Sequence, residues 1–239
     1  MIDSIDIVGA RGRVGSTVTA RLAERGVALD APSPELVLLC VPDRAIAEVA
    51  SGIPVGPWIA HVSGATPLDA LDPHTRRFCL HPLQSFSKER GAEQLDGVWG
   101  AVSAEADEAR AVARWLAEML GLRPFDLDDA RRAAYHAGAA MASNYLVTLR
   151  AAAQSLLEAA GAPPEALDPL IRGVMDTGFE LTGPIARGDW ETVERHLAVI
   201  RAERPELEEL YLVLAEATAR LAGRELPSDT VSQGLGTTR

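Results

Sequence analysis

Three glycines near the N-terminus have the spacing of a phosphate-binding turn. Gly9, Gly12 and Gly15 follow an apolar run that begins at Ser4, so the pattern is GxxGxxG. It is the GxGxxG pattern of dinucleotide-binding folds with one residue added. The first glycine permits a tight turn, the second lets backbone N–H groups approach a pyrophosphate, and the third lets the next helix lie close to the strand. The helix dipole also favours phosphate there. An ordinary strand-to-helix turn is the alternative interpretation.

Side chains capable of acid–base chemistry stand where later apolar runs end, at 36–41, 58–62 and 78–80. Ligands of open α/β sheets bind outside the carboxyl ends of the strands, so we expect these groups at one rim. A proline directly follows His81 and ends its strand there, whereas His61 lies inside its run and is equally consistent with a core histidine. The residues at the ends of the runs are Pro42, Asp43, Ser63, Gly64, His81 and Gln84.

A long alanine-rich helix is predicted from 129 to 160. At 100° per residue, Arg132, His136 and Ser143 fall on one stripe of this helix, and Asn144 lies at its edge. Small residues beside polar ones on one face suit a ligand that passes close by. A solvated face interrupted by alanines is the alternative.

The order of the predicted elements indicates two domains. Strand and helix patterns alternate up to about residue 125, which indicates an α/β fold with a mostly parallel, Rossmann-like sheet. From 126 onward the pattern is helical only. We therefore expect a dinucleotide-binding type of domain at 1–125, an all-α domain at 126–226, and a flexible tail at 227–239.

The composition argues against nucleic acid and anionic membranes as partners. The chain has 239 residues and a net charge of −11, with a pI near 4.9, which argues against nucleic acid and anionic membranes. An export signal and a membrane-spanning stretch are not indicated, so we expect a cytoplasmic protein. Cys40 and Cys79 lie in apolar runs without a CxxC partner and are interpreted as buried hydrophobic residues. No metal site is predicted.

Several motifs together resemble a known family. The chain is similar over nearly its whole length to Rossmann-like proteins that carry the DUF2520 domain, which are similar to the 6-phosphogluconate dehydrogenase, pyrroline-carboxylate reductase and ketopantoate reductase superfamily. This resemblance implies an NAD(P) domain followed by a helical domain that often dimerises, and hence a homodimer formed through the helical domain. The motifs are VPD at 41–43, HVSGA at 61–65, HPLQSF at 81–86, YHAG to SNY at 135–145, and LTGPIARGD at 181–189.

The resemblance also implies roles for individual residues. The glycine turn would hold the pyrophosphate of NADP or NAD, and Val41 and Pro42 would border the nicotinamide ribose. His81 or His136 would donate a proton, since imidazole titrates near neutral pH, and Asn144 would orient the substrate. The expected cofactor residues are Gly9, Arg11, Gly12, Arg13, Val14, Gly15, Val41 and Pro42. The expected catalytic residues are His81, His136, Asn144 and Ser63. The expected substrate residues are Gly64, Gln84, Arg132 and Ser143.

The chain departs from the family pattern in two places. Arg132 stands where the family often has lysine, and a permanently charged guanidinium suggests a clamp for an anionic substrate. The second departure concerns the adenosine side. Asp30 has the spacing of a ribose-binding acid, yet the next strand begins only six residues later, too soon for a regular neighbouring parallel strand. The second strand is therefore predicted to be a stub or absent, and Asp30 is either a ribose ligand or a turn residue.

The first functional hypothesis is an NAD(P)-dependent oxidoreductase that transfers hydride to a C=O or C=N group of a small, anionic substrate. A second is a cofactor-independent enzyme of lyase or cyclase type, with His81 and His136 as acid and base, on a scaffold that has lost the dinucleotide. A third is a non-catalytic ligand-binding protein.

Overall fold

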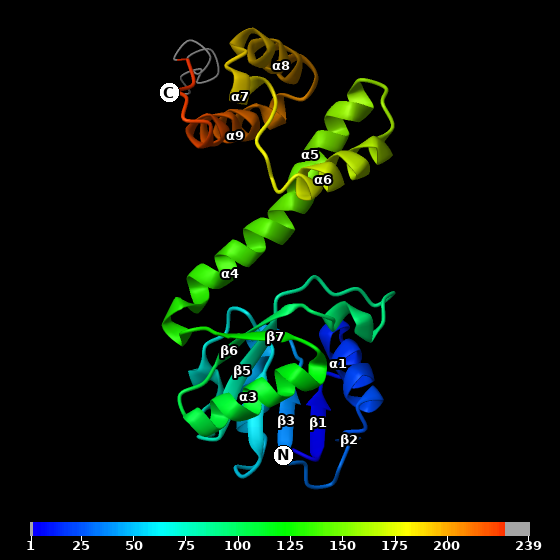
Figure 1. The fold of residues 1–239 in the computed structure, drawn as a ribbon, viewed down its shortest axis with the longest axis vertical. Coiled ribbons are helices and arrows are strands. Elements are labelled where there is room, and N and C mark those ends of the chain that lie inside the picture. The colour runs from blue at the N-terminus through cyan, green and yellow to red at the C-terminus, as the bar shows by residue number, and fades with distance from the viewer. Residues whose placement is uncertain (1, 228–239) are drawn as a thin grey trace. The chain divides into compact units, whose positions relative to one another are not determined.

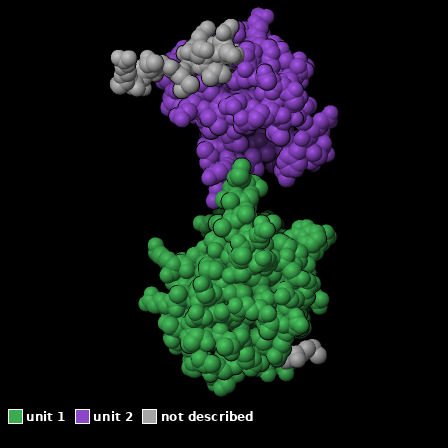
Figure 2. Space-filling model, turned by 90° about the vertical axis from the view of Figure 1, so that its left-hand side faces the viewer, with its two compact units in different colours: residues 1–143 green, residues 144–239 purple. Residues whose placement is uncertain are grey.

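The computed structural model describes residues 2–227 and divides the chain into two compact units, 1–143 and 144–239 (Figure 2). The sequence places the domain boundary at 126, whereas the first turns of the long helix belong to the first unit. The reason is that Arg132 is buried there. The sequence predicts a flexible tail at 227–239. Residues 228–239 of this tail lie outside the described residues.

The described part of the first unit contains a seven-stranded sheet in the order β2-β1-β3-β4-β5-β6-β7 (Figure 1). Only β6 runs antiparallel to its neighbour β5, and all other neighbouring pairs are parallel. The predicted α/β class with a mostly parallel sheet is confirmed. The strands are β1 Ser4–Val8, β2 Ala28–Leu29, β3 Leu36–Leu39, β4 Trp58–His61, β5 Arg77–Pro82, β6 Trp99–Ser103 and β7 Arg123–Asp126.

Helices cover both faces of this sheet, which explains why its strands are continuous apolar runs. Helices α1 (Arg13–Glu24) and α3 (Asp107–Leu120) share one hydrophobic cluster with Leu36 and Leu38 of β3. Helix α2 (Ile46–Ser51) belongs to another cluster, with the alternate β3 residues Val37 and Leu39. Since side chains of a strand alternate between its faces, the two clusters lie on opposite faces.

The second strand is a stub, which was one of the two predicted forms. β2 pairs with β1 only through Ala28 with Ser4 and Leu29 with Ile5. The chain then passes to β3, on the other side of β1, without an intervening helix. Asp30 is exposed and adopts the left-handed backbone conformation, with φ of 59°. It is therefore a turn residue.

The second unit is all-α in its described part, as predicted. Helix α4 (Arg132–Ala140), in the first unit, is followed by a π-helical turn at Met141–Tyr145, within which the division between the units falls. Within residues 2–227, no helix is both long and apolar enough to cross a membrane. The helices of the second unit are α5 Leu146–Ala159, α6 Leu167–Asp176, α7 Pro184–Arg187, α8 Trp190–Glu203 and α9 Glu208–Leu221.

Candidate functional site

The glycine turn joins β1 to α1 and is built as the spacing predicts. Gly9 has φ of +93°, and a Cβ there would collide with the carbonyl group of Cys40. A Cβ at Gly15 would collide with the carbonyl group of Gly9. The N–H of Gly12 donates to that same carbonyl oxygen over 2.9 Å and closes the turn. The first and third glycines are thus required by backbone packing, whatever the turn binds.

The N-terminus of α1 is suited to an anion. Gly12 is the N-cap residue and no side-chain hydrogen bond caps this end, so the first N–H groups of the helix remain for an external acceptor. Arg11 and Arg13 are exposed beside it, while Val14 is partly buried against the core. A pyrophosphate fits this arrangement of donors and charges.

The adenosine side of a dinucleotide fits less well. Leu29, the last residue of β2, pairs with Ile5, whereas β1 continues to Val8 before the glycine turn. At about 3.3 Å per residue, Asp30 lies roughly 10 Å short of the turn along the strand direction. It is not placed to bind a ribose held there. Val41 contacts the turn, because a Cβ on Gly9 would lie 3.3 Å from its Cγ1 atom, and the exposed Pro42 follows it.

Two imidazoles converge on Gly64 at the same rim. His81 comes from β5, His136 from α4, and Gly64 from the loop after β4. A Cβ on Gly64 would lie 2.9 Å from Cδ2 of His136 and 2.9 Å from both Cε1 and Nε2 of His81. Any larger residue would displace at least one ring. These three predicted residues are therefore brought together, and the glycine leaves room for the rings.

The surroundings of His81 keep its ring neutral. Its Nδ1 atom lies 2.7 Å from the hydroxyl oxygen of Tyr135. Burial, followed by the nearby His136 and Arg132, lowers the pKa of His81 to about 4. Burial raises the pKa of Tyr135 to about 12, so the phenol is also neutral at pH 7. His136 is exposed, and it is the member of the pair that solvent reaches more freely.

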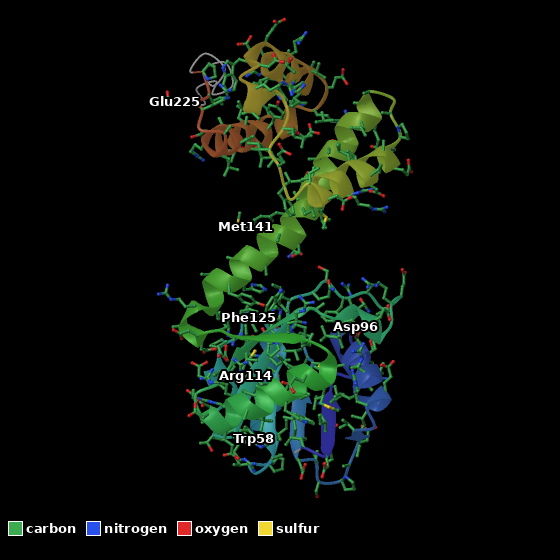
Figure 3. All side chains as sticks on the ribbon, in the orientation of Figure 1. Trp58, Asp96, Arg114, Phe125, Met141 and Glu225 are labelled. Atoms are coloured by element: carbon green, nitrogen blue, oxygen red, sulfur yellow. The ribbon has the colours of Figure 1, made fainter. Side chains whose placement is uncertain are left out.

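Tyr135 was not among the residues selected from the sequence. Its ring packs edge-on against His81, with centroids 5.5 Å apart, and against Phe125, with centroids 6.0 Å apart. Phe125 is labelled on β7 in Figure 3. The available signal was its position three residues after Arg132, because residues three and four apart share a helix face. Arg132, Tyr135 and His136 therefore face the sheet together.

Arg132 corrects one expectation. Its side chain is 2% exposed, and its N–H groups donate hydrogen bonds to other groups of the protein. Nε donates to Asp129 over 2.9 Å, Nη2 to the hydroxyl of Ser103 over 2.7 Å, and Nη1 to the carbonyl oxygen of Ser63 over 3.1 Å. Nη1 also lies 3.3 Å from the sulfur of Cys79. The prediction that Arg132 binds a substrate anion is wrong, because the guanidinium instead fastens α4 to the sheet.

Two other predicted residues have structural partners. The hydroxyl oxygen of the buried Ser63 accepts the N–H groups of Ala65 and Thr66, at 3.1 and 2.9 Å, and so shapes the turn that presents Gly64. Gln84 is exposed, and its amide donates to the carbonyl oxygen of Gln94 over 3.3 Å. Both side chains stabilise loops at the rim.

Ser143 and Asn144 lie in the π-helical turn. The hydroxyl of Ser143 donates to the carbonyl oxygen of Ala139 over 2.7 Å, within its own helix. Asn144 is exposed and begins the second unit. π-helical turns are frequent at functional sites, and the role of Asn144 in orienting a substrate stays a prediction.

His61 is a core histidine and not a residue of the rim, so one of its two interpretations is confirmed. It is fully buried in β4, and its Nδ1 atom accepts the N–H of Ser63 over 3.2 Å. Burial is the main cause that lowers its pKa to about 4. Within residues 2–227, no three His, Cys, Asp or Glu side chains are gathered as metal ligands.

The sheet and the glycine turn define a Rossmann-like fold, followed by a helical C-terminal part. Residues 98–218, just over half of the chain, match the family described as "Domain of unknown function (DUF2520)". The chain belongs to this family, as the motifs predicted.

Solved structures share the fold. A candidate NADP oxidoreductase from Bacteroides fragilis, BF3122, is similar with 24% identity and a TM-score of 0.77, over 92% of this chain and 98% of that one. Protein TM1727 from Thermotoga maritima has 26% identity and a TM-score of 0.75, with the same coverages of 92% and 98%. A 1-pyrroline-5-carboxylate reductase from Streptococcus pyogenes has 16% identity and a TM-score of 0.57, over 92% and 97%. Among curated proteins none matches.

The lowered pKa of His81 predicts a pH dependence of stability. Between pH 6.5 and about 4, the unfolded chain protonates this imidazole while the folded chain does not. Stability therefore falls on acidification through this window, by up to about 1.4 kcal/mol per pH unit for one imidazole. Urea unfolding at pH 7, 5.5 and 4.5 measures the slope. We expect a shallower slope for His81→Gln and the wild-type slope for Ser85→Ala, which removes no titrating group. An unchanged slope in His81→Gln would contradict this assignment.

Proposed function

We propose that the protein is an NAD(P)-dependent oxidoreductase that transfers hydride to a C=O or C=N carbon of a small substrate. The observation that carries the proposal is the convergence of His81 and His136 on Gly64, at the same sheet edge as an uncapped helix N-terminus that fits a pyrophosphate. The similarity of the fold to a candidate NADP oxidoreductase and to a 1-pyrroline-5-carboxylate reductase supports it. Because Arg132 is buried and its guanidinium is hydrogen-bonded within the protein, it does not support an anionic substrate.

In this proposal the glycine turn, Arg11 and Arg13 hold the phosphates, and Val41 and Pro42 border the nicotinamide ribose. A bound reduced nicotinamide supplies the hydride. Because the second strand ends short of the rim, we infer that the adenosine ribose receives less support than in a complete dinucleotide fold.

His81 acts as a neutral hydrogen-bond donor in this scheme. A phenol is a stronger donor than a neutral imidazole, and an imidazole nitrogen is the better acceptor, so we assign the shared proton to Tyr135. Nδ1 of His81 then accepts, and its ring proton lies on Nε2, the atom beside Gly64. An Nε2–H there polarises a carbonyl or imine group. With a pKa of about 4, His81 is a poor source of a full proton at pH 7.

Proton donation falls instead to His136. It is exposed, so it exchanges protons with solvent, and it contacts the same position at Gly64 as His81. The two imidazoles therefore divide the work: His81 orients and polarises the substrate heteroatom, and His136 protonates it.

One observation favours the second hypothesis, a cofactor-independent enzyme. The shortened β2 leaves Asp30 away from the turn, while the imidazole pair is complete without any nucleotide. Such an enzyme would use His136 and His81 for proton transfer alone. Its activity would need no nucleotide and would survive a change at Gly12.

We also propose that the protein is a homodimer through its helical unit. In α5 none of the 14 residues is buried, although its composition is apolar. An exposed apolar surface of this kind is typical of an interface. The resemblance to dimerising reductases favours a second copy as the occupant. The large exposed apolar residues of α5, α6 and the adjoining π-helical turn are Met141, Tyr145, Leu146, Val147, Leu149, Leu170, Val174 and Met175.

The cofactor assignment is tested by calorimetric titration of the full chain with NADPH and NADH. At least one should bind, and Gly12→Asp should weaken it about tenfold or more, because the new carboxylate occupies the N–H groups meant for phosphate. Aspartate is a favourable N-cap residue, so this variant should fold. Ala20→Asp, an exposed position on the same helix, is the matched control and should bind normally. Absence of binding at millimolar concentration of both nucleotides would exclude the proposal, and nucleotide-free turnover unaffected by Gly12→Asp would establish the alternative.

The tautomer of His81 is tested by ¹⁵N NMR of the imidazole rings. We expect a protonated Nε2 and an unprotonated Nδ1 at pH 7. Tyr135→Phe removes the donor and should give a mixture of tautomers, whereas Tyr145→Phe, an exposed tyrosine, should leave the spectrum unchanged. A wild-type ring protonated on Nδ1 would reverse the assigned direction of the hydrogen bond.

The dimer is tested by light scattering coupled to size exclusion. The wild type should have twice the monomer mass, and Val147→Glu should shift it to the monomer because a charge enters the apolar surface. Val55→Glu is a close match, since Val55 is 67% and Val147 69% exposed, and it should remain dimeric. A monomeric wild type would refute the proposal.

A further inference from the structure

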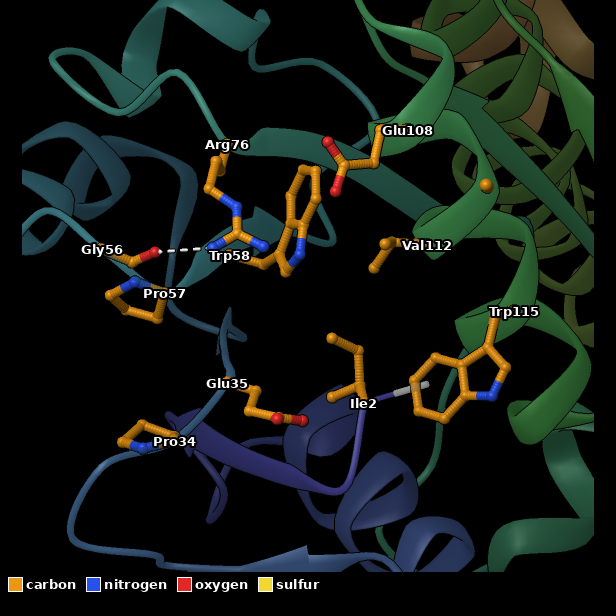
Figure 4. Close-up of a pocket in the computed structure, with 11 residues that line it drawn as sticks. Ile2, Pro34, Glu35, Gly56, Pro57, Trp58, Arg76, Glu108, Val112 and Trp115 are labelled. Carbon is orange, nitrogen blue, oxygen red and sulfur yellow. Dashed lines mark hydrogen bonds between the residues drawn. The ribbon is translucent and has the colours of Figure 1, made fainter.

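A cavity of about 660 Å³ lies at the amino-terminal edge of the sheet, in the first unit (Figure 4). Residues that line it come from the beginnings of the strands and from helix α3. Arg76 lines the cavity just before β5, and His81 stands near the other end of the same strand. The two positions are therefore roughly 16 Å apart along the strand. The cavity is separate from the candidate active site and has the size of a small-molecule pocket.

One wall of the cavity is formed by a buried, packed tryptophan. Trp58 is 4% exposed and packs against Phe78, with ring centroids 6.4 Å apart. The guanidinium carbon of Arg76 lies 4.5 Å from the centroid of the Trp58 ring, and Nη1 of Arg76 donates to the carbonyl oxygen of Gly56 over 3.1 Å. Among the described residues that line the cavity, Arg76 is the only basic one, and its side chain lies against this wall.

The other wall is apolar and more exposed to solvent than the wall formed by Trp58. Trp115 extends from α3 and lies near Ile2 in Figure 4, and Val112 stands one turn earlier on the helix. Trp115 is partly exposed. Among residues 2–227 it has no aromatic or cationic stacking partner, unlike Trp58. It packs against the hydrophobic core cluster and also lines the cavity, where a ligand can contact it.

Two carboxylates border the same space. Glu35 precedes β3 and accepts the N–H of Asp3 over 2.6 Å. Glu108 lies in the first turn of α3 and has no ion-pair partner in the described part of the chain. Carboxylates outnumber the single arginine among the lining residues, and the chain carries a net charge of −11. The field at this opening favours a cation.

We propose that this cavity binds an organic cation, an ammonium or guanidinium group carried on an apolar stem. The stem lies against Ile2, Val112 and Trp115, and the charge stands near the indole of Trp115 and the carboxylates of Glu35 and Glu108. A small free amine and the basic side chain of a partner peptide share this chemistry. The site is independent of hydride transfer.

Calorimetry on the full chain tests the site with four probes. These are 2-phenylethylammonium, its neutral analogue 2-phenylethanol, the blocked peptide acetyl-Ala-Arg-Ala-amide, and the same peptide with Gln in place of Arg. We expect the charged member of at least one pair to bind about tenfold more tightly than its neutral partner. Preference for the amine identifies a small-molecule site, and preference for the arginine peptide identifies a peptide site.

Substitutions of lining residues test whether the probes bind in this cavity. Glu35→Gln combined with Glu108→Gln should weaken the charged probe about tenfold, and Trp115→Leu should weaken it while keeping an apolar wall. Glu118→Gln, an exposed glutamate on the same helix outside the cavity, should bind as the wild type does. The glutamine variants change exposed side chains only, so loss of folding does not confuse the result. Equal binding of charged and neutral probes, no effect of the double variant, or no binding at millimolar concentration would each overturn the proposal.

Discussion

The buried guanidinium of Arg132 is the contact on which the candidate site depends. It joins the loop after β4, the strands β5 and β6, and Asp129 at the start of the long helix. A buried charge that loses its partners costs several kcal/mol, so the first turn of α4 is held in one position. Tyr135 and His136 follow within one helical turn and are placed by it. The positive charge also helps to keep His81 neutral.

This arrangement gives different environments to two histidines that the sequence alone could not distinguish as proton donors. His81 is partly buried, faces a cation and is bonded to a phenol, and its pKa is lowered to about 4. His136 is exposed to solvent, although its ring also lies beside Gly64. In the proposed function, these different environments give the two histidines different roles: His81 polarises the substrate and His136 protonates it. Gly64 permits the arrangement, because any side chain there would occupy the space of the rings.

The two edges of the sheet have different character. The carboxyl edge carries the glycine turn and the histidines, which suit phosphate and a polar reacting group. The amino edge carries Trp58, Trp115 and two carboxylates, which suit a cation. The shortened β2 affects only the first edge. The glycine turn belongs to β1 and α1 and is intact, whereas the part of the sheet that would carry an adenosine ribose is missing.

The sequence by itself determined the α/β class, the glycine turn, a second strand that is either a stub or absent, and the histidine near the end of β5. These follow from local periodicity, from backbone space at Gly9 and Gly15, and from the short distance between two strands along the chain. Tertiary structure decided that Arg132 faces inward, that Tyr135 bonds His81, and that the first unit extends to residue 143. Helical spacing shows which residues share a face, but only packing against the sheet shows whether that face meets solvent, a ligand or the core.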